Sequence, residues 1–226
     1  LEDIGEKFSL TRERVRQIEN HALNKLRESD ALAEEQPVFE ELHNLLHTLG
    51  GVVPEDHLLT HISPKKDIQN HTYLLLTLGD PFDRAREDKK LKHRWHVDER
   101  LEKAITDALE RLHKSLGRHE LVSEQEVIDR FVSYLEDIPE AHSHHKNNED
   151  VLKRWLNLSK QVDKNPLGEW GRATSPNVKV KGVRDYAYLV LRDHGSPMHF
   201  TEVTERIKEL FGKKAHTATT HNELIK

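Results

Sequence analysis

The chain has 226 residues, of which 35% are hydrophobic and 33% are charged, with 40 acidic and 35 basic side chains and no cysteine. The lack of cysteine excludes disulfides and thiolate metal sites and fits a reducing compartment, so we expect a cytoplasmic protein. No apolar run approaches the about 20 residues of a membrane span, and the low hydrophobic fraction predicts several small helical units with thin cores.

Residues 1–27 predict two helices joined by a tight turn. Leu1, Ile4 and Phe8 recur at helical spacing in the first helix, and the stripe stops at Ser9. Thr11 offers a hydroxyl to the free amides of a second helix, whose first turn contains an acid. The apolar residues of the second helix keep the 3–4 spacing and should face the first helix: Val15, Ile18, Ala22 and Leu26.

The opposite face of the second helix carries side chains that can read bases. Arginine matches guanine O6 and N7, glutamine matches adenine N6 and N7, and glutamate accepts from cytosine N4. Residues 11–27 hold five Lys or Arg against two acids, which suits a helix lying between phosphates. The polar face is formed by Arg12, Glu13, Arg16, Gln17 and Asn20.

Charge spacing alone leaves open an ordinary amphipathic hairpin whose charges only solvate its surface. The sequence of residues 4–19, IGEKFSLTRERVRQIE, closely resembles the promoter-reading helix-turn-helix in region four of primary bacterial sigma factors. By that resemblance Arg12, Glu13 and Gln17 touch base edges of a -35-like promoter element. The same resemblance implies that Thr11, Arg14 and Arg16 lie nearer the phosphates. Contacts to phosphates position a protein on DNA but do not specify the sequence. Because the chain starts at Leu1 inside a helix, we expect it to be a piece of something longer.

The next segments predict a winged helix over residues 36–97. Residues 28–36 are acid-rich and are interpreted as a linker or a helix extension. A helix over 38–49 ends at Gly50-Gly51, a short strand follows at Val52-Val53, and two helices lead to a hairpin over 82–97. The hairpin has a basic tip and ends near Trp95, which we interpret as a structural anchor rather than a base-stacking residue.

The same order of elements predicts a second winged helix over residues 98–176. A long helix over 99–116 is followed by Ser123 and Glu126, a capping-box pattern that opens the next helix. Residues 137–147 are polar and predict a mobile loop. A helix near 148–158 and a hairpin over 161–172 complete the unit, with Trp170 in the returning strand as a second anchor.

Residues 182–226 resemble the HARE-type helix-turn-helix, a winged-helix family found in the delta subunit of some bacterial RNA polymerases. The resemblance is carried by residues 188–203, YLVLRDHGSPMHFTEV. We expect a helix to Asp193, a short strand at 198–200, a helix capped by Thr201 and a last helix from Thr217. The chain stops before a wing, so this unit is predicted to be truncated.

Charge divides the predicted units. Residues 84–96 hold six Lys or Arg and two acids, so the first wing can lie along a phosphate backbone through Lys89, Lys90 and Lys92. Residues 120–150 hold nine acids and two bases and would be repelled by DNA, which suits a protein partner or solvent.

Catalytic and metal sites are not expected. His43 and His47 are one helical turn apart and His142, His144 and His145 cluster, but a zinc site needs three or four ligands in fixed geometry. The chain has no Gly-x-Ser-x-Gly and no Gly-rich phosphate loop. A metal-dependent enzyme is therefore a poor interpretation, and no cofactor is predicted.

Together these patterns predict a mainly α chain with a helix-turn-helix over residues 1–30, winged helices over 36–97 and 98–176, and a HARE-type unit over 182–226. The predicted function is sequence-specific binding of promoter-like double-stranded DNA in bacterial transcription, alongside RNA polymerase core. Neither a membrane nor a small-molecule substrate is expected as a partner. The alternative is an interaction scaffold whose winged helices bind proteins, with only minor DNA contact.

Overall fold

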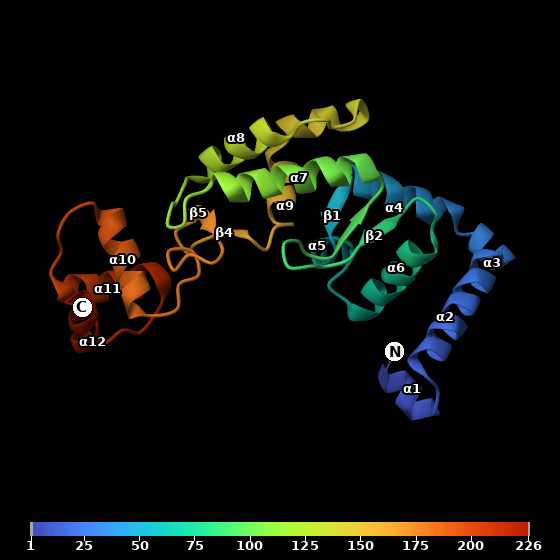
Figure 1. Ribbon diagram of the computed structural model, residues 1–226, viewed down its shortest axis with the longest axis horizontal. Helices are drawn as coiled ribbons and strands as arrows, with labels where there is room; N and C mark the ends of the chain where they lie inside the picture. The colour runs from blue at the N-terminus through green and yellow to red at the C-terminus, as the bar shows by residue number, and fades with distance from the viewer. Residues whose placement is uncertain (1, 226) are drawn as a thin grey trace. The chain divides into compact units, whose positions relative to one another are not determined.

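A computed structural model describes residues 2–225 of the chain, which is mostly helical with short antiparallel strands (Figure 1). The chain divides into two compact units. One unit runs to Arg86 and includes His93–Glu102, and the other contains Glu87–Lys92 and the chain from Lys103 on. The predicted fold class, helical units with small hairpins, is confirmed.

The first unit begins with the helix-turn-helix and continues into a helical core with a three-stranded sheet. Its strands lie in the order β1-β3-β2, with both pairs antiparallel and both Val52 and Asp83 opposite His96. Its elements are α1 Glu2–Phe8, α2 Arg12–Arg27, α3 Asp30–Ala33, α4 Gln36–Thr48, β1 Val52–Pro54, α5 Glu55–Ile62, α6 Lys66–Leu78, β2 Asp83–Ala85 and β3 Arg94–His96.

The sharp turn from α4 into β1 depends on glycine. Gly50 and Gly51 have φ values of 110° and 73°, a region that residues with a Cβ rarely adopt. The turn sends Val52 and Val53 into the core, where Val53 packs with Leu46, Phe82 and Trp95. This part of the predicted winged-helix order, helix, strand, helix, helix, hairpin, is therefore present.

Polar contacts fix the hairpin of the first unit to its helices. The Glu55 carboxylate accepts from Arg84 Nε at 2.5 Å and from Trp95 Nε1 at 3.1 Å. The Tyr73 ring meets Trp95 edge-on at 5.7 Å and lies under the Arg84 guanidinium at 5.3 Å. Trp95 is 2% exposed, so it anchors the hairpin as predicted.

The second unit contains the remaining helices and a two-stranded sheet. Its elements are α7 Glu99–Ser115, which starts just before the boundary, α8 Glu124–Tyr134, the 3-10 helix η1 Glu140–Asn147, α9 Glu149–Leu156, β4 Val162–Lys164, β5 Trp170–Arg172, α10 Val183–His194, α11 Phe200–Phe211 and α12 Thr217–Leu224.

Local signals in the second unit behave largely as expected. Ser123 Oγ accepts from Glu126 N at 3.1 Å and starts α8, and β4 pairs antiparallel with β5 with Lys164 opposite Trp170. Val122 forms an isolated antiparallel bridge with Trp170, which is 2% exposed. The predicted capping site and hairpin are confirmed.

Two predictions for the second unit are wrong. The segment expected to be a mobile loop forms η1, because His142 and His145 are buried and the His145 ring meets Trp155 edge-on at 5.9 Å. Residues 198–200 are not a strand: α11 already begins at Phe200, with His199 rather than Thr201 as its N-cap. In this part of the chain α10 and α11 pack together through a buried cluster of Ala187, Val190, Val203 and Ile207.

Candidate nucleic-acid interface

The tight turn between α1 and α2 is built on a close backbone approach at Gly5. Leu10 N donates to Gly5 O at 2.8 Å, and a Cβ on Gly5 would lie 2.6 Å from Leu10 O. Ser9 takes a left-handed φ of 54° to complete the turn. Only glycine fits at position 5 without moving the second helix.

Thr11 caps the second helix, as predicted. Its backbone is extended, and its Oγ1 accepts from Arg14 N at 3.2 Å. Val15 N then donates to Thr11 O at 3.0 Å. The cap fixes where α2 begins and thus which residues form its exposed first turns.

The three predicted base-reading side chains lie on α2 and are all exposed. Glu13 accepts from Arg16 through both oxygens, at 2.6 and 2.8 Å. Gln17 Nε2 lies 3.4 Å from Glu13 Oε1, so the structure brings Glu13, Arg16 and Gln17 together. Arg12 reaches instead toward α1, where its guanidinium donates to Glu2 at 2.9 Å.

Electrostatics keep the exposed face of α2 charged. The hydrogen bonds from Arg16 lower the pKa of Glu13, and Glu13 in turn raises the pKa of Arg16. Arg14 donates to Gln17 Oε1 at 3.4 Å. Such exposed pairs contribute only about 0–1 kcal/mol each, so a ligand with its own donors and acceptors can replace them at small cost.

The apolar face of α2 differs from the prediction. Val15 is 8% exposed, as expected for a residue that packs on α1, but Ile18 and Leu26 are 46% and 44% exposed and Ala22 is exposed too. The short α1 covers only the first turn of α2, so the rest of the apolar stripe has no cover from it.

Arg27 is a positioning residue that sequence reasoning did not single out. Its guanidinium donates to Thr77 O at 2.8 Å and to Leu78 O at 3.4 Å, the carbonyls that end α6. A cation is favourable at these unpaired carbonyls. In the sequence, the only signal for this contact is the presence of a basic residue in the last turn of α2. That signal does not identify the carbonyls that the residue contacts.

The predicted phosphate-contacting lysines of the first wing are not equivalent. Lys89 is exposed, whereas Lys90 Nζ lies 2.9 Å from Glu110. Lys92 is half-buried and its backbone N donates to Leu158 O at 2.9 Å. The hairpin tip is thus paired with residues 158–160, including a bridge from Leu91 to Ser159, rather than projecting freely.

The Lys90 side chain is held in a salt bridge by Glu110. Hydrogen bonds from Lys114 and Lys90 lower the pKa of Glu110 to about 2. Glu110 therefore stays ionised over the whole range in which the protein would be handled, and a phosphate must compete with it for Lys90.

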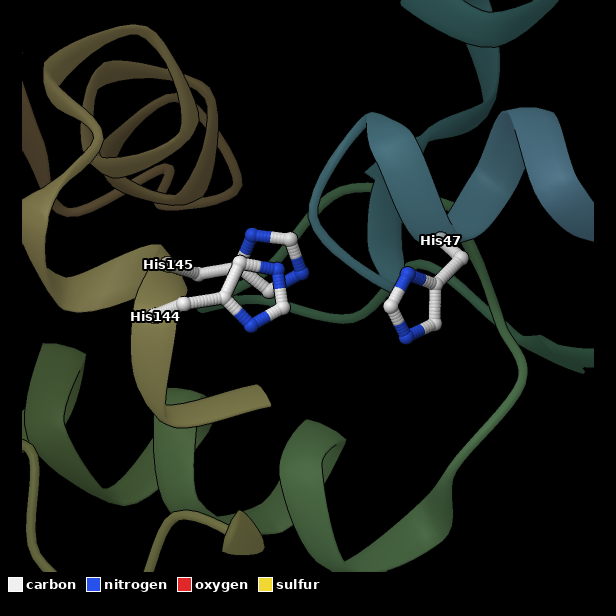
Figure 2. Close-up of side chains that lie close together, drawn as sticks. All are labelled: His47, His144 and His145. Atoms are coloured by element: carbon white, nitrogen blue, oxygen red, sulfur yellow. The ribbon is translucent and has the colours of Figure 1, made fainter. Parts of the chain in front are cut away.

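The clustered histidines lie on the 3-10 helix. The rings of His144 and His145 are 4.0 Å apart, and both side chains leave η1 side by side (Figure 2). His142 and His145 stack at 5.8 Å. His47, predicted to be near His43 on one helix, lies on α4. Within the second unit these contacts are those of packed rings on one short helix.

The comparisons with known proteins agree with the geometry of the first two helices. Residues 1–28 match the family model described as Sigma-70, region 4. No curated protein and no solved structure is matched by the chain. Among residues 2–225 no helix is long and apolar enough to cross a membrane. The chain thus carries at its start a sigma-factor-like, DNA-binding helix-turn-helix of the kind used in transcription.

Proposed function

We propose that this chain binds promoter-like double-stranded DNA sequence-specifically, with α2 in the major groove. The observation that carries the proposal is the exposed face of α2, on which Arg12, Glu13 and Gln17 stand in a segment that matches Sigma-70, region 4. Arginine, glutamate and glutamine together can discriminate guanine, cytosine and adenine. The reading target is a -35-like element.

The phosphates on either side of the groove are contacted by the residues around the reading face. Thr11, at the N-cap, lies where backbone amides and a helix dipole favour an anion. Arg14 and Arg16 supply cations on the next turn. Lys89 adds an exposed charge, Lys90 joins it where a phosphate displaces Glu110, and the half-buried Lys92 lies on the same hairpin tip.

The rest of the chain acts together with α2 in bacterial transcription, with RNA polymerase core as the protein partner. We propose winged-helix units at 36–97 and 98–176 and a HARE-type unit at 182–226. The protein acts in the cytoplasm and is not an enzyme.

Gel shifts with the full chain test the proposal. A duplex with a -35-like element should be bound at least tenfold more tightly than a scrambled duplex of equal length, because each bidentate base contact is worth about 1–3 kcal/mol. Arg12→Ala combined with Gln17→Ala should remove the preference. Equal binding of both duplexes by the unchanged protein would end the reading role.

A scaffold that mainly binds proteins is the second candidate. It is favoured by residues 120–150, whose nine acids and two bases would be repelled by DNA. A pull-down with polymerase core beside the gel shifts separates the two. Capture of polymerase without a duplex preference supports the scaffold, and a duplex preference supports the reading role whether or not polymerase is captured.

A further inference from the structure

The second unit contains a basic segment that includes none of the predicted DNA-contacting residues. Residues 160–184 hold six Lys or Arg against two acids, whereas residues 120–150 of the same unit are strongly acidic. The basic segment comprises β4, the hairpin turn, β5 and the chain that leads to α10 (Figure 1). Its positive charge is therefore shared between this hairpin and the chain that follows it.

A hollow of about 600 Å³ lies at this hairpin, between β4 with its turn and residues 173–180. Three lysines line it: Lys160, Lys164 and Lys179. One acid, Asp163, also lines it, and its carboxylate accepts from Lys164 N at 2.8 Å. The lining thus carries a net charge of +2.

Hydrogen bonds hold both walls of the hollow. The buried Asn165 side chain accepts from Leu167 N at 2.9 Å and from Glu169 N at 3.0 Å, which fixes the hairpin turn. On the other wall, Ser175 O accepts from Lys179 N at 2.9 Å, and the Asn177 side chain donates to His119 O at 3.1 Å. The lysine backbones are therefore positioned by the fold.

Neighbouring acids have partners elsewhere, which leaves the charge of the hollow available. Glu169 is paired with Arg192 at 2.7 Å, and Glu124 with Lys153 at 2.5 Å. The hydrogen bond from Lys153 is the main cause that lowers the pKa of Glu124, and the charge of Lys164 adds a smaller effect. Lys160 forms a salt bridge with Glu87, with Nζ 3.2 Å from the carboxylate. Lys164 and Lys179 are exposed and form no salt bridge among residues 2–225.

We propose that this hollow is a second contact site for the phosphate backbone of duplex DNA. Lysines are point charges that bind phosphates without reading sequence. The lining has no aromatic, methionine or arginine side chain, the residues that anchor protein partners. A polyanion recognised by charge alone fits it better than a peptide does.

The inference deepens the proposed function, since duplex DNA is the ligand in both, but it rests on different residues. The α2 face would select the sequence, and the hollow would add affinity that is the same for every sequence. The two claims can therefore be tested separately. The role of α2 is tested by the ratio of affinities for promoter-like and scrambled duplexes, and the role of the hollow by the affinity for any duplex and its salt dependence.

The test is fluorescence anisotropy of the full chain with a labelled scrambled duplex over a range of salt concentrations. Lys164→Gln with Lys179→Gln should weaken binding by about tenfold and flatten the slope of log affinity against log salt by about two, one for each lost phosphate contact. Lys103→Gln with Lys208→Gln removes the same charge from exposed positions on α7 and α11 and serves as the control.

A loss confined to the hollow variant, with unchanged thermal unfolding, supports the site. Equal losses in both variants would mean that overall charge is responsible and would overturn it. An unchanged affinity and slope in the hollow variant would overturn it as well, whatever the ratio between promoter-like and scrambled duplexes.

Discussion

On the exposed side of α2, Arg14, Glu13, Arg16 and Gln17 are joined by hydrogen bonds of 2.6 to 3.4 Å. These bonds restrain the four side chains, and side chains restrained before binding lose less rotamer entropy on binding. Gln17 is central in this set because its amide contacts both Arg14 and Glu13.

Gln17→Ala is expected to relax recognition at one base pair. Discrimination at that position should fall by about 1–3 kcal/mol while other positions are unchanged. A panel of duplexes with single base-pair changes measures this. A uniform loss across the panel would assign Gln17 to the backbone instead, and Asn44→Ala, which removes an exposed amide from α4, is the matched control.

His96 makes the first unit sensitive to acid. It lies on β3, 7% exposed, and its Nδ1 has no hydrogen-bond partner among the described residues. Burial lowers the pKa of His96 below its ordinary 6.5, against the opposing effects of Glu102, Asp83 and Glu99 and with the help of Arg94. The folded protein therefore resists protonation of a group that the unfolded chain protonates readily.

The sign of the effect follows from linkage. As the pH falls below about 6.5, the unfolded chain binds a proton at His96 that the folded chain does not, so stability decreases until the lower folded pKa is passed. His96→Gln should reduce the loss of stability between pH 7.5 and 5.5, as measured by urea unfolding. An identical loss in both proteins would place the acid sensitivity elsewhere.

At the scale of elements, the turn between α1 and α2 sets how the exposed polar face of α2 is presented. Gly5→Ala should destabilise the pair of helices by about 1–3 kcal/mol, because the added Cβ meets the Leu10 carbonyl at 2.6 Å. Hydrogen exchange of the α2 amides measures the change locally.

Ser9→Gly in the same turn is the control for Gly5→Ala. Its φ of 54° suits glycine, so exchange in α2 should slow or stay the same. If Gly5→Ala left exchange in α2 unchanged, the close approach would not be what holds the two helices.

The hairpin of the first unit depends on one carboxylate that accepts from two strands. Glu55→Gln should cost about 2 kcal/mol, since it leaves the half-buried Arg84 cation without its counter-charge. Urea unfolding measures the loss. Glu41→Gln, on the exposed side of α4, should leave stability within about 0.5 kcal/mol.

Short-range signals were the parts of the fold that sequence could predict. The Thr11 and Ser123 caps, the Gly50-Gly51 turn and the β4–β5 hairpin all depend on residues close together in the chain. The η1 helix could not be predicted because its order depends on the contact of His145 with Trp155. The same holds for the site: the exposed polar face of α2 was predicted, whereas the Arg27 contact with α6 spans about fifty residues.

At the scale of the whole molecule, the division of charge accounts for a net charge of -5 on a proposed DNA-binding chain. Basic side chains gather in α2, the first hairpin tip and residues 160–184, whereas residues 28–41 hold six acids and no Lys or Arg and residues 120–150 hold nine acids and two bases. Because about 8–10 Å of salt solution screens most of a surface charge, a local basic surface can bind DNA on an acidic protein.

Methylation protection of a -35-like duplex by the full chain shows whether α2 enters the major groove, because dimethyl sulfate attacks guanine N7 there. If α2 lies in the groove, the unchanged protein protects guanine N7 within the element and Arg12→Ala loses this protection, since arginine occupies O6 and N7. Bound duplex whose guanines react uniformly, with or without Arg12, would contradict the placement of α2 in the major groove.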